Sequence, residues 1–260
     1  MKREMVVWAV INFILIGLYG GPSVALSVDE NTVALWLFDE GAGNVAKDSS
    51  ENGNNGKVVE AEWVSGKFGI ALKFDGIGGK VDYIEVPGSA SLDISKALTI
   101  EAWVNMKNHQ NDNIRIVTGY NGAVTAGYSL LLSQTGQVRT YLHVGGWSEM
   151  TGQTIIPVGE WTHLAVTFDG KTVKLYINGE VDFEGVLSGK ITSRGMDPLY
   201  IGRFTEGDPE TPDGVIDEVR ISNVARNQEE IKEAMDGLAQ APVQPLNKIA
   251  TTWGSLRSGY

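Results

Sequence analysis

Two aspartates that share the phase of apolar residues in strand-like segments offer the first hint of chemistry in this sequence. Asp217 falls in phase with the apolar residues of segment 215–221, so a regular strand would point its carboxylate where those side chains point. Asp39 falls in phase with the apolar residues of segment 33–37 in the same way. A buried carboxylate needs hydrogen-bond donors or a cation, because an unpaired buried charge costs too much free energy.

Calcium suits this combination of residues. It takes roughly six to eight oxygen ligands from carboxylates, amide side chains and backbone carbonyls. Segment 48–56, which is rich in Asn, Gly and Ser, offers all three kinds. We therefore predict one structural calcium ion held by Asp39, Asp48, Asn52 and Asp217, with backbone oxygens completing the shell. The alternative is that the aspartates accept hydrogen bonds from backbone N–H groups and that the segment simply turns.

A second group of residues suits sugar recognition. Trp147 follows two glycines and Tyr120 precedes an Asn-Gly pair, so both aromatic side chains are expected in turns. An exposed ring can stack on the apolar face of a sugar, while polar neighbours supply directional hydrogen bonds. We assign that polar role to Arg139, His143 and Glu149. The alternative is that Trp147 folds back as a lid over the core.

The remaining pattern predicts the elements that position these side chains. Residues 160–184 contain three alternating runs separated by Asp-Gly and Asn-Gly turns, as expected for an antiparallel meander. Helical signals occur at residues 227–235, where Asn227 and Glu230 have the spacing of a capping box. An all-β antiparallel sandwich with one short C-terminal helix is therefore predicted. Further strand-like runs lie at 33–38, 71–74, 83–86, 99–104, 114–117, 129–132, 138–143, 198–201 and 215–221.

The start of the chain has the pattern of a secretory signal peptide. Lys2 and Arg3 precede an apolar run at 5–18, and a small-x-small cleavage site occupies 23–25. The alternative, an uncleaved membrane anchor, would need about 20 apolar residues. We expect a protein that is exported to the extracellular space or the cell surface and is not inserted in the membrane after cleavage.

Composition limits the partners and the domain plan. The net charge of −11 disfavours nucleic acid, whose binding needs a basic surface. The chain has no cysteine, so neither a disulfide framework nor a thiolate metal site is possible. We predict a signal peptide at 1–25, one domain at 26–237, and a linker and tail at 238–260. The tail is either an accessory segment or an exposed recognition or sorting peptide.

Short motifs occur along the chain in a fixed order. They include Ala-Leu-Trp-Leu-Phe-Asp-Glu-Gly at 34–41, Leu-Thr-Ile-Glu-Ala-Trp-Val at 98–104, Trp-Thr-His-Leu-Ala at 161–165 and Gly-Val-Ile-Asp-Glu-Val-Arg-Ile at 214–221. Together they resemble the laminin G-like domains of the concanavalin A-like lectin/glucanase superfamily, from residue 33 to about residue 235. The resemblance implies a concanavalin A-like jelly roll of two curved sheets and a tendency to bind calcium.

From the residues and the resemblance we expect a secreted, non-catalytic module that binds carbohydrate or a glycosylated or matrix protein surface, stabilised by calcium. One alternative is a divergent glycoside hydrolase or polysaccharide lyase of the same fold. Retaining glucanases of the superfamily carry a Glu-x-Asp-x-Glu triplet on one strand face, and this sequence has that spacing at 180–184 and at 206–210. The other alternative is an adhesion module that binds protein through a sheet edge.

Overall fold

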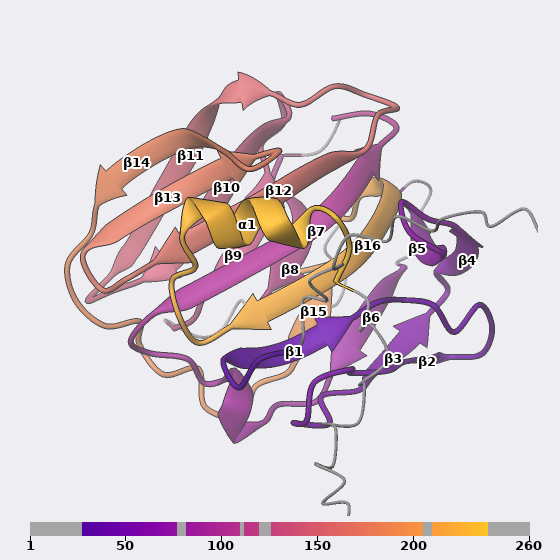
Figure 1. The fold of residues 1–260 in the computed structure, drawn as a ribbon, viewed down its shortest axis with the longest axis horizontal. Helices are drawn as coiled ribbons and strands as arrows, with labels where there is room; N and C mark the ends of the chain where they lie inside the picture. Colours follow the sequence, from indigo (N-terminus) through magenta and orange to yellow (C-terminus); the bar gives the residue numbers. More distant parts are fainter. Residues whose placement is uncertain (1–27, 77–81, 110–111, 120–125, 205–209, 239–260) are drawn as a thin grey trace, which may run out of the picture.

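The computed structural model describes residues 28–76, 82–109, 112–119, 126–204 and 210–238. Two antiparallel sheets of eight strands each pack face to face, so the predicted fold class is confirmed (Figure 1). The predicted signal peptide, most of the predicted tail and Tyr120 lie outside the described residues.

Sheet A contains the meander predicted from the sequence. Its order is β14-β13-β12-β7-β16-β5-β4, and β1 pairs with β16 on the same sheet. Because β1 pairs with β16, two segments that are far apart in the sequence lie side by side in this sheet. The strands are β1 (Thr32–Trp36), β4 (Glu62–Ser65), β5 (Ile70–Asp75), β7 (Leu98–Met106), β12 (Thr162–Phe168), β13 (Thr172–Ile177), β14 (Glu180–Val186) and β16 (Asp213–Ser222).

Sheet B forms the second layer, in the order β11-β10-β9-β8-β15-β6-β3-β2. A short 3-10 helix, η1 (Ala90–Leu92), lies between β6 and β7 in the chain. The strands of sheet B are β2 (Val45–Ala46), β3 (Gly56–Val59), β6 (Tyr83–Val86), β8 (Ile114–Thr118), β9 (Ser129–Leu132), β10 (Gln137–His143), β11 (Trp147–Ile155) and β15 (Leu199–Ile201).

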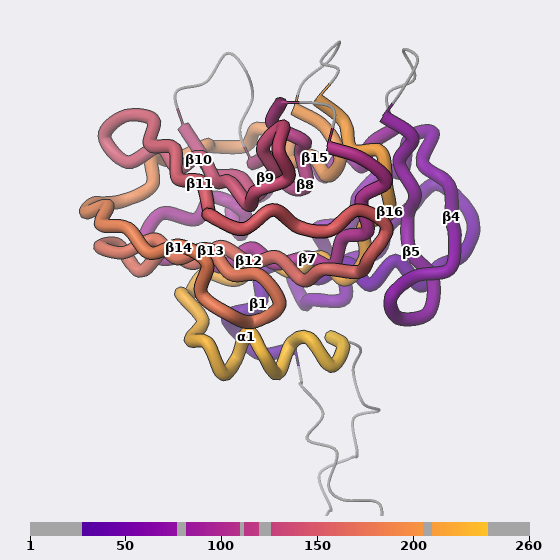
Figure 2. The backbone as a smooth tube through the Cα atoms, turned by 90° about the horizontal axis from the view of Figure 1, so that it is seen from above, coloured from indigo at the N-terminus to yellow at the C-terminus, as the bar shows by residue number. Residues whose placement is uncertain are grey.

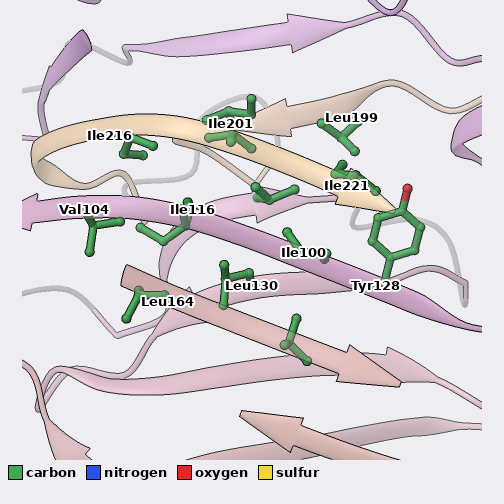
Figure 3. Packing of buried hydrophobic residues seen from close by; sticks show 14 of the residues in the cluster. Ile100, Val104, Ile116, Tyr128, Leu130, Leu164, Leu199, Ile201, Ile216 and Ile221 are labelled. Carbon is green, nitrogen blue, oxygen red and sulfur yellow. The ribbon is translucent and has the colours of Figure 1, made fainter. Parts of the chain in front are cut away.

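The core lies between the two sheets, where apolar side chains from alternate positions of the strands meet (Figure 3). Strand β10 shows the alternation clearly. Val138, Thr140 and Leu142 are buried, whereas the residues between them face outward and are only partly buried. The outward residues of β10 therefore define the surface of sheet B.

A helix covers the outer face of sheet A. Helix α1 (Gln228–Ala234) begins with the capping box predicted from the sequence, since Asn227 accepts from the backbone of Glu230 and the Glu230 side chain accepts from the backbone of Asn227. Ile231 packs against Ala165 and Tyr176 on sheet A. Figure 2 shows α1 as a separate layer on one side of the sandwich. Consequently β12 is buried on both faces.

Four strands were not predicted from the sequence, namely β2, β3, β4 and β11. The first three are short, with two to four residues each. Strand β11 is longer, but as the edge strand of sheet B it carries few buried side chains and little alternation. Trp147, expected in a turn, is instead its first residue.

Candidate functional site

The two sheets differ in what lies on their outer faces. Helix α1 and the turn at residues 66–69 pack on the outer face of sheet A (Figure 2). In the part of the chain that the structure describes, no helix or strand covers the outer face of sheet B. We call these surfaces the covered face and the open face. Four of the predicted ligand-binding residues, those on β10 and β11, lie on the open face.

The strand pair β10–β11 brings those residues into register. His143 lies opposite Trp147, and the two rings are 5.1 Å apart with an interplanar angle of 84°. His143 Nδ1 lies 2.8 Å from the hydroxyl of Thr192, which holds the imidazole in place. Trp147 is 42% exposed. It is therefore a surface ring braced by a histidine, and not a lid over the core.

Next to this aromatic pair is a polar network. Tyr141 lies opposite Glu149 and Arg139 lies opposite Thr151 on the same two strands. Arg139 Nη1 donates to Asn113 Oδ1 at 2.8 Å, and Arg139 Nε lies 3.3 Å from Glu149 Oε1. The Tyr141 hydroxyl lies 3.1 Å from Glu149 Oε2 and 3.2 Å from Asn113 Oδ1. These contacts hold directional donors and acceptors in fixed positions beside the exposed ring.

The surroundings of Tyr141 keep its hydroxyl group protonated. Burial, followed by the neighbouring Glu149 carboxylate, raises the pKa of Tyr141. The Tyr141 hydroxyl therefore keeps its proton at neutral pH and can donate it to only one acceptor at a time. Glu149 and Asn113 also contact Arg139, so the four side chains form one connected network.

The structure brings together four of the five predicted ligand-binding residues, Arg139, His143, Trp147 and Glu149, while Tyr120 lies outside the described residues. Tyr141 and Asn113 were missed by the sequence analysis. Tyr141 shares the strand phase of Arg139 and His143, so the alternation of β10 could have identified it. Nothing in the sequence distinguishes Asn113 from other loop residues.

The open face continues across β8 and β15 with two arginines stacked on aromatic rings. Arg115 lies over Phe204, with Cζ 4.5 Å from the ring centroid, and its Nε donates to Glu210 at 2.8 Å. Arg203 lies over Tyr83 and Tyr200, at 4.1 Å and 5.2 Å from their centroids. The face thus combines the exposed indole of Trp147 with buried guanidinium groups that lie against aromatic rings.

Two of the residues predicted to hold calcium lie along β1. Asp48 accepts four hydrogen bonds, from the backbone N–H groups of Leu35, Ser50 and Asn54 and from the Ser50 hydroxyl. Asn52 donates through its amide nitrogen to Val33 O at 3.0 Å. These contacts tie the loop to the strand, as the hydrogen-bonded alternative describes.

The other two predicted ligands meet at the turn of residues 66–70. Asp217 Oδ2 accepts from the N–H groups of Lys67 and Phe68, and its Oδ1 accepts from that of Glu218. Asp39 Oδ1 accepts from Ile70 N at 3.0 Å. Both aspartates therefore anchor the backbone of this turn.

The strand phases of both aspartates differ from the prediction. A β-bulge between Asp217 and Arg220, with Glu218 at φ 50°, shifts the alternation of β16. Asp217 is buried, but it lies on the covered face and not among the core residues. Asp39 is exposed because β1 ends at Trp36 and Phe38, at φ 57°, redirects the chain.

Burial also changes the acidity of this region. It raises the pKa of Asp217 to about 6 and that of Glu218 to about 8, even though both carboxyl groups accept backbone hydrogen bonds. Among the residues that the structure describes, no three His, Asp or Glu side chains are grouped so as to hold a metal ion. The four predicted ligands do not fit a single calcium site, because donors already occupy most of their oxygens. Calcium binding stays a prediction.

The fold and this face define a class of protein, a lectin-like β-sandwich that presents one sheet surface to solvent. A family model described as the concanavalin A-like lectin/glucanases superfamily matches residues 78–232. This chain therefore belongs to that superfamily, as its motifs predict.

Solved structures of similar fold include several binding domains. Domain 4 of AbnA, a GH43 extracellular arabinanase from Geobacillus stearothermophilus solved in complex with arabinotriose, has a TM-score of 0.62 and 22% identity, over 78% of this chain and 97% of that domain. The binding domain of Paraclostridial Mosquitocidal Protein 1 has a TM-score of 0.64 and 18% identity, over 79% of this chain and 52% of that chain.

A third similar structure concerns botulinum neurotoxin type C, whose cell entry depends on interaction with two ganglioside molecules. Its TM-score is 0.60 and its identity 14%, over 80% of this chain and 51% of that chain. This chain thus spans about half the length of the mosquitocidal and neurotoxin chains that it matches. In the described residues, no helix is both long and apolar enough to cross a membrane.

Proposed function

We propose that this protein is a non-catalytic, exported binding module that recognises a carbohydrate chain on the open face, at strands β10 and β11. The observation that carries the proposal is the exposed ring of Trp147, braced by His143 and flanked by the network of Arg139, Tyr141 and Glu149. A sugar ring would stack on the indole, and its hydroxyl groups would exchange hydrogen bonds with the network.

Preorganisation supports this assignment. The contacts of Arg139 with Asn113 and Glu149 hold its guanidinium in place before any ligand arrives. A ligand then pays less conformational entropy on binding than it would at a mobile side chain. Export is part of the proposal because residues 1–25 have the pattern of a signal peptide.

The position of the acidic groups supports the absence of catalysis. A general acid at neutral pH needs a raised pKa and access to substrate. The two carboxyl groups whose pKa burial raises, Asp217 and Glu218, are buried on the covered face. On the open face, Glu149 and Glu210 form ion pairs with arginines. We therefore favour binding over a glycoside hydrolase or lyase.

An edge contact argues against the adhesion alternative at β11. Asp182 of β14 accepts hydrogen bonds from the N–H groups of Gln153 and Thr154 on the edge of sheet B. A carboxylate placed there occupies donors that an added strand would need. The similar structures add a parallel, since the arabinanase domain was solved with arabinotriose.

Glycan-array screening of the chain from residue 26, followed by titration calorimetry with arabinotriose and the best array hit, tests the proposal. We expect W147A to weaken binding roughly tenfold or more, and W147F to keep most of the affinity because it retains a stacking ring. V186A, which shortens an exposed side chain on β14, is the matched control and should bind as wild type. The proposal fails if no saccharide binds, or if W147A binds as well as wild type.

A further inference from the structure

We propose that Arg203, together with Tyr83 and Tyr200, forms a second subsite on the open face that binds the carboxylate of an acidic sugar unit. This inference rests on the proposed function and adds the charge of the ligand to it. It begins from an arginine whose charge has no counterpart in the described structure.

The setting of Arg203 is an aromatic pair. Tyr83 lies on β6 and Tyr200 on β15, with ring centroids 6.1 Å apart and an interplanar angle of 70°. Their neighbours Ile84 and Ile201 point into the core, so the two rings belong to the outer face of sheet B. Arg203 follows Gly202, whose φ of 84° turns the chain directly after β15. The guanidinium is thereby brought over both rings.

Arg203 differs from the other buried arginines in its partners. It is 3% exposed, and its Nε and Nη2 are buried without a hydrogen-bond partner among the described residues. By contrast Arg220 donates to Glu101, Arg226 donates to Asp29, and Arg194 donates to backbone carbonyl oxygens. Arg203 forms no ion pair with any described residue, although a buried cation without an anion is costly.

Stacking on the tyrosines compensates only part of that cost. A cation over an aromatic ring gains roughly 0.5–2 kcal/mol. An anion that accepts both free N–H groups would supply the remainder, and a planar carboxylate matches the guanidinium fork. Tyr83 and Tyr200 are each partly exposed, so a ligand that displaces either ring reaches Arg203.

The position of the subsite implies an extended ligand. Strand β15 is four steps from β11 in sheet B, or roughly 19 Å at about 4.8 Å per strand. A chain that stacks on Trp147 could therefore place another unit near Arg203. The negative net charge does not prevent this, because interactions between exposed charges are screened beyond about 8 Å at physiological ionic strength. Glu85, the acid opposite Tyr200, also has Lys57 opposite it on the next strand.

Calorimetry with charged and neutral probes of equal size tests the inference. Trigalacturonate is compared with its methyl ester, and sialyllactose with lactose, so that an internal uronate and a terminal acidic sugar are examined separately. We expect at least one acidic probe to bind roughly tenfold tighter than its neutral partner. R203Q should abolish that preference without weakening the neutral probe, and R203K should reduce it, because Lys keeps the charge but loses the fork.

K47Q removes an exposed positive charge directly after β2 of the same sheet and should keep the preference. If R203Q unfolds at a lower temperature than wild type, R203K decides the outcome. The inference alone falls if the neutral probes bind through Trp147 as tightly as the acidic ones, or if Arg203 variants keep the preference. If no probe binds and the glycan array shows no other ligand, the proposed function falls with it.

Discussion

The covered face and the open face each carry an arginine–glutamate ion pair, which is buried on the covered face and exposed to water on the open face. On the covered face, Glu101 accepts from Arg220 at 2.6 Å and is fully buried with His163 beside it. On the open face, Arg139 meets Glu149 at 3.3 Å, and the side chain of Glu149 remains 47% exposed. The buried pair must be satisfied for the chain to fold, whereas the exposed pair is available to a ligand.

The acidity of Glu101 shows how the covered face accommodates its charge. Burial alone would raise the pKa of Glu101, yet the charges and hydrogen bonds of Arg220 and His163 outweigh burial and lower it. Glu218 has no such partner at its carboxylate, so burial raises its pKa to about 8. The comparison indicates that ion pairing decides which acids on this face stay charged.

The largest expected effect comes from breaking the buried pair. E101A leaves Arg220 buried without its carboxylate, so we expect a loss of about 3–5 kcal/mol in the free energy of unfolding. E149A, the matched change on the open face, should cost less than about 1 kcal/mol. Urea denaturation of both variants measures the difference. Equal losses would show that burial does not separate the two faces.

The next effect concerns the pH dependence of stability. Because the folded chain binds the proton of Glu218 more tightly than the unfolded chain does, its contribution to stability is complete below about pH 4 and is lost as the pH rises through about 8. The raised pKa of Asp217 adds to this pH dependence, because its contribution to stability is lost as the pH rises through about 6.

We therefore expect E218Q to be more stable than wild type at pH 8, by on the order of 2 kcal/mol, with little difference at pH 4. Thermal unfolding from pH 4 to pH 8 measures this change. E233Q, on the exposed side of α1, should follow the wild-type curve. Parallel curves for E218Q and wild type would contradict the assignment.

The smallest expected effect sharpens the comparison on the open face. A double-mutant cycle of R139A and E149A should give a coupling energy of about 0.2–1 kcal/mol, because water screens this pair. Urea denaturation of wild type, the two single variants and the double variant measures this coupling energy. A coupling above about 2 kcal/mol would mean that the open face is more desolvated than its exposure indicates.

Much of the fold was predictable because strand alternation and turn residues are local signals. Strands β6 and β9 have the predicted bounds, and the Asn227 capping box is present. Short or edge strands such as β3 and β11 bury too few side chains to leave a clear pattern.

The site was predictable in part for the same reason. Arg139 and His143 were placed correctly because β10 alternates regularly, with one side in the core. The face of the sheet on which the Asp217 side chain lies was not predictable from the sequence. It depends on a β-bulge at Glu218, which has a positive φ, and this bulge depends on tertiary contacts. Arg203 was missed since its significance lies in an absent partner, which no sequence pattern reveals.

The two ends of the described chain meet behind sheet A. Val28 and Leu238 pack in one small cluster with Leu35 and Ala234, on the side of the sandwich opposite the open face. A mechanical load applied through residues 28 and 238 would be borne by this cluster and by the β1–β16 pairing. Strands β10 and β11 of the open face belong to the other sheet and would lie outside the direct path of that load.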